Sequence, residues 1–198
     1  LDKQYDTWWL LWCTRPEMRQ AMRPLQRYIG TARNGKYRLF QWFPLQVLPD
    51  SQVVAIARDD DVCFGILHSR FHDAWSLGLC SWLGMGNDPR YTPSTTFETF
   101  PFPEGLTPNI AAADYASDPR AIAIATAAKR LNELRENWLN PPDLVVRVPE
   151  VVAGYPDRIM PKDAAAAVTL KNRTLTKLYN QRPAWLDNAH RDLDAAVA

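Results

Sequence analysis

The sequence predicts an α+β fold, in which a small antiparallel sheet with a packed amphipathic helix is followed by a mostly helical C-terminal region. Three observations predict it: β-prone runs separated by turn residues, apolar residues at helical spacing after three aspartates, and alanine-rich helical segments in the second half. The chain has 198 residues and a hydrophobic content of 46%, which is enough for a sizeable core.

The first predicted elements are a short helix and a sheet. Arginines at positions 15, 19, 23 and 27 recur every four residues, which places them on one side of a helix, and Pro24 limits this helix to the residues before it. Asn34-Gly35 lies between two β-prone runs and predicts a hairpin turn. The run "SQVVAIA" predicts another strand, so we expect a small antiparallel sheet over residues 25–58.

A single amphipathic helix is predicted next, in the segment "VCFGILHSRFHDAWSLGLCSWLG". The aspartates at positions 59, 60 and 61 suit its N-terminus, and Gly84 and Gly86 suit its end. Its apolar residues recur at helical spacing: Ile66, Leu67, Phe71, Trp75, Leu79 and Trp82.

The segment "GNDPRYTPSTTFETFPFP", residues 86–103, has the period of neither a helix nor a strand. Long loops of this kind in compact domains are often functional. Ser117 or Asp118 then caps a helix that Pro141 ends, and an irregular stretch runs to about Pro161. Two more helices are predicted in "KDAAAAVTLKNRTLTKLYNQ" and "AWLDNAHRDLDAAV". We therefore divide the chain into a first domain, residues 1–105, and a helical region, residues 106–198.

Composition excludes some classes of protein. The three cysteines have no CxxC spacing, which favours free thiols in a reducing compartment and predicts a cytoplasmic location. No apolar run is long enough to span a bilayer, so no membrane partner is expected. The first residues, "LDKQYDTWWLLW", resemble the middle of a domain, and we expect the chain to be a fragment of a longer protein.

Charge is distributed unevenly although the net charge is only +1. Residues 15–38 contain seven basic residues and one acid, with aromatic residues interleaved. Basic side chains neutralise phosphates, and Arg, Asn and hydroxyl groups on loop tips can bind base edges or sugars. We therefore predict double-stranded DNA as a partner; the alternative is a solvated sheet face and ordinary turn geometry. The predicted DNA contacts are Arg33, Asn34, Lys36 and Arg38 in the hairpin, Asn87, Arg90, Tyr91 and Thr92 in the loop, and Ser69 and Arg70 in the apolar helix.

Two alternative functions remain open from the residues. His68 and His72 are one helical turn apart, as in zinc-binding pairs, which would suit a metal-dependent hydrolase; Ser69 stands where the HExxH motif has its glutamate, and no third ligand can be assigned. A protein–protein docking module is the other alternative. Its apolar stripe would consist of Leu170, Leu175, Leu178, Trp185 and Leu193. We predict neither a catalytic residue nor a metal site in this chain.

Five stretches resemble the C-terminal part of MmeI-like adenine-specific DNA methyltransferases, which are single-chain restriction–modification enzymes. They are "WWLLWCTRPEMRQAM", "RYIGTARNGKYRLFQWF", "LPDSQVVAIARDDDVCFGILHSRFHDAWSL", "GNDPRYTPSTTFETFPFP" and "LTKLYNQRPAWLDNAHRDLDAAV", in the family's order. The resemblance implies that the first domain is a target recognition domain that reads DNA sequence, with a helical region packed behind it.

The resemblance also implies what the chain lacks. In such enzymes the S-adenosylmethionine site and the catalytic Asn/Asp-Pro-Pro-aromatic motif for DNA methylation lie upstream. Here "NPPD", residues 140–143, has Asp143 in place of the aromatic ring that stacks on a flipped adenine, and it follows a helix. We therefore expect no cofactor in this fragment, no methylation by it alone, and an upstream methyltransferase domain of the same parent chain as a second partner.

Overall fold

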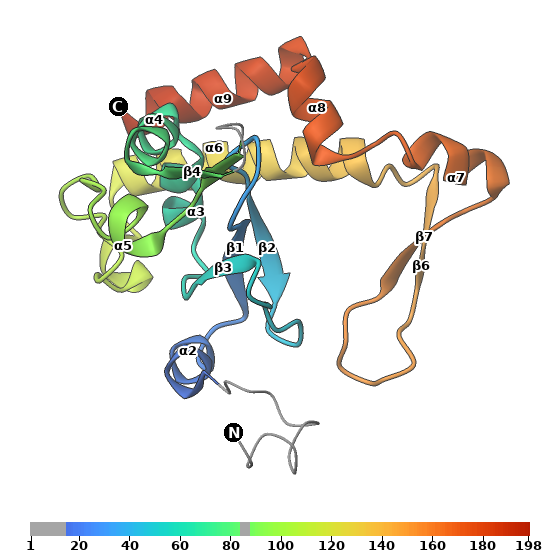
Figure 1. Ribbon diagram of the computed structural model, residues 1–198, viewed down its shortest axis with the longest axis horizontal. Helices are drawn as coiled ribbons and strands as arrows, with labels where there is room; N and C mark the ends of the chain where they lie inside the picture. The colour runs from blue at the N-terminus through green and yellow to red at the C-terminus, as the bar shows by residue number, and fades with distance from the viewer. Residues whose placement is uncertain (1–14, 84–87) are drawn as a thin grey trace.

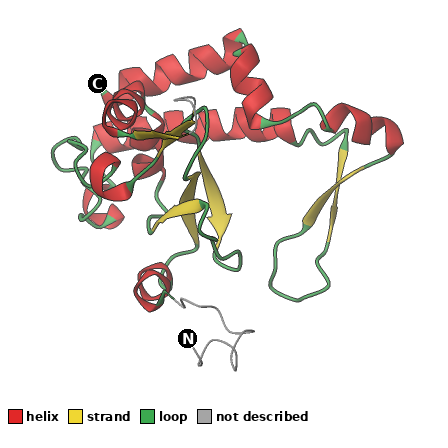
Figure 2. Cartoon of the chain, viewed as in Figure 1, coloured by secondary structure: helices red, strands yellow, loops and turns green. Residues whose placement is uncertain are grey.

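The computed structural model describes residues 15–83 and 88–198. Helices pack above a small three-stranded sheet, and two-stranded ribbons lie beside it (Figure 1). Figure 2 shows how helix and strand alternate along the chain. The predicted α+β fold class is confirmed.

The three-stranded sheet lies within residues 25–58, as predicted. Its strands are β1 (Arg27–Ala32), β2 (Phe40–Pro44) and β3 (Val53–Ile56). Central β1 pairs antiparallel with both neighbours, with Ile29 opposite Trp42 on one side and Ile56 on the other. Helix α2 (Pro16–Met22) precedes the sheet and ends before Pro24, which confirms the short helix.

The segment predicted as one apolar helix forms two, α3 (Asp61–His68) and α4 (Arg70–Leu79), so this prediction was wrong. Ser69 between them is extended and caps α4, because its Oγ accepts a hydrogen bond from the backbone N–H of His72 at 3.4 Å. After the break, a different face of the helix points into the protein from the one predicted. Phe71 and Leu79, predicted on the apolar face, are exposed, whereas His72 is buried. The predicted end was also wrong: α4 ends at Leu79, and Trp82, predicted to lie in the helix, is in a strand. Gly84 and Gly86 themselves lie outside the described residues.

The loop after α4 contains regular structure that the sequence pattern did not predict. Strand β4 (Ser81–Leu83) pairs antiparallel with β5 (Asp88–Arg90), and the short helix α5 (Pro93–Thr96) follows. A 3₁₀ turn, η1 (Ala112–Tyr115), leads to the next helix.

The core forms where α3 crosses the long helix α6 (Pro119–Leu139) and α9 (Ala184–Val197). Gly65 lies at this crossing, where an added Cβ would be 2.8 Å from the Ile124 side chain, so only glycine allows the helices to approach this closely. Asp118 caps α6, as predicted. One hydrophobic cluster joins residues from both sides of position 105, so the two predicted parts share a core.

The C-terminal part departs from the prediction in two places. The stretch expected to be irregular forms the antiparallel hairpin of β6 (Val145–Val148) and β7 (Arg158–Pro161). The next predicted helix is two helices, α7 (Ala164–Leu170) and α8 (Leu175–Gln181), because Thr174 caps α8 by accepting a hydrogen bond from the backbone N–H of Lys177. Within the described residues no helix is long and apolar enough to cross a membrane.

Candidate nucleic-acid interface

The two segments predicted to contact DNA lie side by side. One is the β1–β2 connection, residues 33–39, and the other is the chain from β5 to Thr92, residues 88–92. The backbone N–H of Tyr91 donates to the carbonyl oxygen of Arg33 at 2.7 Å, and Asn34 forms a β-bridge with Arg90. These segments, residues 33–39 and 88–92, are called the two-loop surface below. Its two parts are joined by backbone hydrogen bonds and therefore move together.

The Asn34-Gly35 signal correctly located the hairpin, but the connection is longer than the two-residue turn that Asn-Gly usually forms. Strand pairing ends at Thr31 and Phe40. Asn34 pairs with Arg90 of the other loop. The longer connection thereby gives residues 33–39 a partner 50 or more positions away in the sequence.

Arg38, a predicted DNA contact, is only 7% exposed and fastens the two loops to each other. Its guanidinium donates to the carbonyl oxygen of Ala32 at 2.6 Å and to that of Pro89 at 3.0 Å. The same group lies over the ring of Tyr91, 4.7 Å from its centroid. The guanidinium of Arg38 is therefore engaged inside the fold. For this reason we reassign Arg38 from a residue that contacts DNA to one that positions the two loops.

Tyr91 and Ser69 are also buried, with 1% and 0% of their surface exposed. The Tyr91 hydroxyl bonds to Nε2 of His72 at 3.0 Å, and the Ser69 hydroxyl donates to the carbonyl oxygen of Ile66 at 2.7 Å. Neither side chain presents surface to a duplex. We reassign both as residues that hold the second loop and the α3–α4 junction in place.

The histidines of the possible zinc pair are engaged within the protein. His72 donates from Nδ1 to the carbonyl oxygen of Leu67, which leaves Nε2 to accept the Tyr91 hydroxyl. His68 donates from Nδ1 to the carbonyl oxygen of Phe64, and its Nε2 faces the guanidinium of Arg135 at 2.7 Å. Among the described residues no group of three or more His, Cys, Asp or Glu could hold a metal ion. The hydrolase alternative therefore has no support from this pair.

The remaining predicted contacts differ in accessibility. Lys36 is exposed, and its Nζ donates at 2.7 Å to the Asn180 amide oxygen of α8, which also accepts the Tyr37 hydroxyl at 2.8 Å. Arg70 is exposed at the start of α4, where its backbone N–H donates to Asp194 of α9. Four of the predicted residues are half-buried in the two-loop surface: Arg33, Asn34, Arg90 and Thr92. A fifth, Asn87, lies outside the described residues.

The basic residues of the N-terminal stretch do not form one patch. Arg19 and Arg23 lie at α2, which joins the start of β1, whereas Lys36 follows the end of β1. Six strand residues separate the two ends by roughly 20 Å. Apart from the buried Arg38, the cationic side chains at the two-loop surface are therefore those of Arg33, Lys36 and Arg90.

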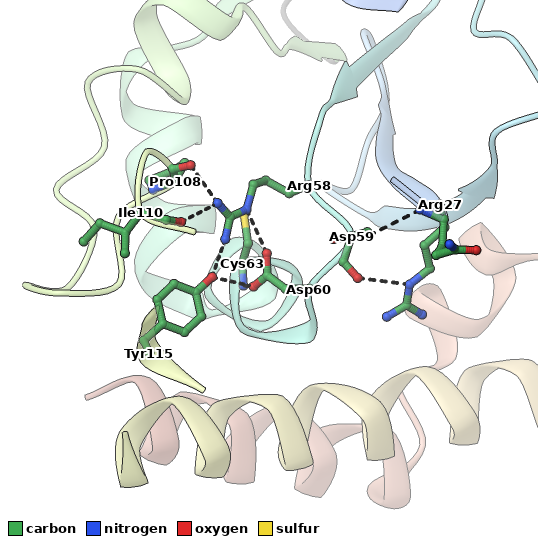
Figure 3. Close-up of polar contacts among 9 residues, drawn as sticks. Arg27, Arg58, Asp59, Asp60, Cys63, Pro108, Ile110 and Tyr115 are labelled. Carbon is green, nitrogen blue, oxygen red and sulfur yellow. Dashed lines mark hydrogen bonds and ion pairs between the residues drawn. The ribbon is translucent and has the colours of Figure 1, made fainter. Parts of the chain in front are cut away.

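A second network, around Arg58, holds the sheet, α3 and the segment before α6 together (Figure 3). Arg58 forms an ion pair with Asp60 at 2.8 Å and donates to the carbonyl oxygens of Pro108 at 2.8 Å and Ile110 at 2.6 Å. It also bonds to the Tyr115 hydroxyl, which donates to Asp60 at 2.9 Å. Asp60 caps α3, as the three aspartates predicted.

Sequence reasoning missed the residues that support the two loops from the C-terminal helices. Asn180 is more than 140 positions from Lys36, and Arg135 of α6 donates to the carbonyl oxygen of Phe40 at 3.0 Å. The sequence contained no local signal for either contact, because each forms only when the helices pack against the sheet.

Residues 25–104 match the family model described as the MmeI target recognition domain. This segment of the chain is an MmeI-type target recognition domain. It contains both parts of the two-loop surface, the α3–α4 pair and Arg58. The helices from α6 onward lie outside the match and supply the support from Asn180 and Arg135.

A solved structure shows the same fold over more of the chain. It is the structure of the type IIL restriction–modification enzyme MmeI in complex with DNA, with a TM-score of 0.55 and 18% sequence identity. The likeness covers 87% of this chain and 18% of the MmeI chain. This chain therefore spans less than a fifth of the length of the MmeI polypeptide that it matches. A comparison with curated proteins finds no match.

Proposed function

We propose that this chain is the DNA-sequence-recognition part of a restriction–modification enzyme, and that the two-loop surface contacts a groove of the duplex. The observation that carries the proposal is the joining of residues 33–39 to residues 88–92 inside the segment that matches a target recognition domain. The likeness to an enzyme solved with DNA supports it.

Buried and accessible side chains have different roles in this proposal. Arg38 and Tyr91 fix the relation of the two loops from within. Arg33, Arg90 and Lys36 then supply the cationic groups for phosphates or base edges, since Arg binds guanine bidentately and Lys neutralises phosphate. A rigid base of this kind lowers the entropy lost when the loops bind.

Methyl transfer to adenine is proposed for the parent enzyme, with S-adenosylmethionine bound upstream. Residues of this chain do not fit the catalytic motif. Asn140 ends α6, with its side-chain amide donating to Glu136 at 3.0 Å, and Asp143 offers no ring for stacking on a base. The adenine specificity, the methyltransferase domain as a partner and the cytoplasmic location stay predictions that follow from the resemblance and from the free cysteines.

The docking alternative loses its apolar stripe. Leu178 and Leu193 are fully buried in the chain's own core, and Leu175 and Trp185 pack against that core. Leu170 is half-buried and is not part of that core. Four of the five stripe residues are thus used within the fold, so the stripe is not a continuous surface for a partner.

Selection of bound duplexes from a randomised pool by this chain tests the proposal. We expect enrichment of one short sequence. Retention of the pool without enrichment would contradict sequence recognition, and failure to retain any duplex at low salt would contradict DNA binding.

Arg90→Ala should relax sequence selectivity at one position of the site. An arginine that reads guanine contributes about 1–3 kcal/mol of discrimination against the wrong base, and this is lost on truncation. Competition binding with single-base variants of the selected duplex measures it. Arg191→Ala on α9, which removes an exposed arginine paired with Asp187, is the matched control and should leave selectivity unchanged. Full selectivity in Arg90→Ala would remove the assigned role.

Lys36→Ala should weaken binding to every sequence alike. Loss of one phosphate contact reduces the slope of log K against log salt by about one unit. Asn180→Leu is an informative control, because it removes the acceptor that holds Lys36 but keeps the charge. We expect Asn180→Leu to leave the salt slope unchanged, and an unchanged slope in Lys36→Ala would show that this lysine makes no phosphate contact.

A further inference from the structure

The β6–β7 hairpin extends away from both the helices and the three-stranded sheet (Figure 1). The hairpin and its connection, residues 145–161, are called the arm. All four residues of β7 are exposed, and β6 has two exposed and two half-buried residues. The arm therefore has little contact with the core that supports the two-loop surface.

Apolar side chains are concentrated on and next to this arm. Half of the exposed large apolar side chains in the described part of the chain lie between residues 146 and 168. Val151 at the connection is 88% exposed, and Tyr155 is 50% exposed. An isolated two-stranded hairpin is marginally stable in water, and clustered exposed apolar groups mark interaction sites.

The charge of the arm indicates a protein partner instead of DNA. Its charged residues are Arg147, Glu150, Asp157 and Arg158, which sum to zero. Arg158 is already paired with Glu150 at 3.4 Å. A surface that binds a duplex carries an excess of cations for its phosphates, whereas the arm has none, because the acids Glu150 and Asp157 equal its two arginines in number.

We propose that the arm docks onto the remainder of the parent restriction–modification polypeptide, inserting its Val151–Tyr155 tip into an apolar groove there. In the MmeI chain, the part that resembles this chain is only 18% of the length, so most of such a polypeptide lies outside the fold described here. A covalently joined surface is present at high effective concentration, which favours this occupant over a free partner. The inference rests on the proposed parentage of the chain and is independent of which DNA sequence the two loops read.

Amide hydrogen exchange in the complete parent polypeptide, compared with this chain alone, tests the docking. We expect amides of residues 145–161 to exchange about tenfold or more slowly in the complete polypeptide, which corresponds to about 1.4 kcal/mol of added protection. The double variant Val151→Asp, Tyr155→Asp should abolish that protection without changing the melting temperature of this chain alone. Ile122→Asp places the same charge on an exposed apolar site of α6 and should leave the arm protected.

Three results would overturn the proposal. Equal exchange of the arm in both polypeptides would show that nothing covers it. Protection in this chain alone that grows with concentration, together with a dimer in sedimentation, would assign the arm to a second copy. Protection that appears only on adding duplex would assign it to DNA. Loss of sequence selectivity with the arm still protected would count against the proposed function alone.

Discussion

The protein should lose stability as the pH falls from about 6.5 toward 4, because its three histidines are held neutral in the fold. Burial, opposed by the hydrogen bond to Leu67, lowers the pKa of His72 to about 4, and burial with nearby Arg182 and Arg135 lowers that of His190 to about 4. Burial and Arg135 lower the pKa of His68 well below its usual value. Above about pH 6.5 these histidines are neutral in both the folded and the unfolded protein, so their contribution to the free energy of unfolding is constant.

Below pH 6.5 the unfolded chain gains protons that the folded chain does not accept, so the free energy of unfolding decreases until the folded pKa is reached. With His72 and His190 each contributing up to about 1.4 kcal/mol per pH unit, we expect these two to account for a loss of roughly 3–4 kcal/mol between pH 7 and pH 5, and His68 adds to it in the same direction. Urea unfolding across this range measures it. His72→Gln should reduce the slope by the equivalent of one proton. Constant stability from pH 7 to pH 5 would show that the histidines are not held neutral.

Arg58→Met should lower the free energy of unfolding by about 3–5 kcal/mol, because it leaves the half-buried Asp60 carboxylate without its cation. The carbonyl oxygens of Pro108 and Ile110 would also lose their donor. Methionine keeps much of the packing of the arginine stem, so the loss would come mainly from the polar network of Figure 3.

Urea unfolding of Arg58→Met and of Arg130→Met separates this network from ordinary surface charge. Arg130 lies on the exposed side of α6, 4.0 Å from Glu133, and its replacement should cost under about 0.5 kcal/mol. A change of less than about 1 kcal/mol in Arg58→Met would mean that the segment before α6 is held by other contacts. Hydrogen exchange at residues 107–115 should increase in the Arg58 variant.

The elements that could be predicted from the sequence are those set by local chemistry. Asp60 and Asp118 cap helices because their side chains reach backbone N–H groups two or three positions ahead, and Pro24 ends a helix wherever it stands. The three strands within residues 25–58 followed from β-prone runs bounded by turn residues. Each of these signals acts over a few residues, so tertiary packing did not override it.

The α3–α4 break could not be predicted from periodicity. Ser69 is compatible with a helix interior as well as with a cap. In the fold it caps α4, and His72 in the first turn of that helix bonds to Tyr91 of residues 88–92, a contact between distant parts of the chain that periodicity does not reveal. The β6–β7 hairpin was missed because its residues lack the alternation of a half-buried strand, since β7 is exposed on both faces.

For the candidate site, the sequence located the two segments but did not distinguish their accessible side chains from their buried ones. Arg38 and Arg90 are the same residue type in similar polar surroundings, yet Arg38 donates to the backbone of Ala32 and Pro89. Which arginine points inward depends on how the loops meet, and that depends on a bridge between residues 34 and 90. Support from Asn180 was equally hidden, because it arrives from the far end of the chain.

The central claim is that residues 33–39 and 88–92 form one surface that contacts duplex DNA. Amide hydrogen exchange of this chain with and without the duplex selected from the randomised pool tests it most directly. We predict slower exchange in both segments together, with little change on the solvent face of α6. Protection confined to other parts of the chain, with both segments exchanging at their free rates in the DNA complex, would contradict the claim.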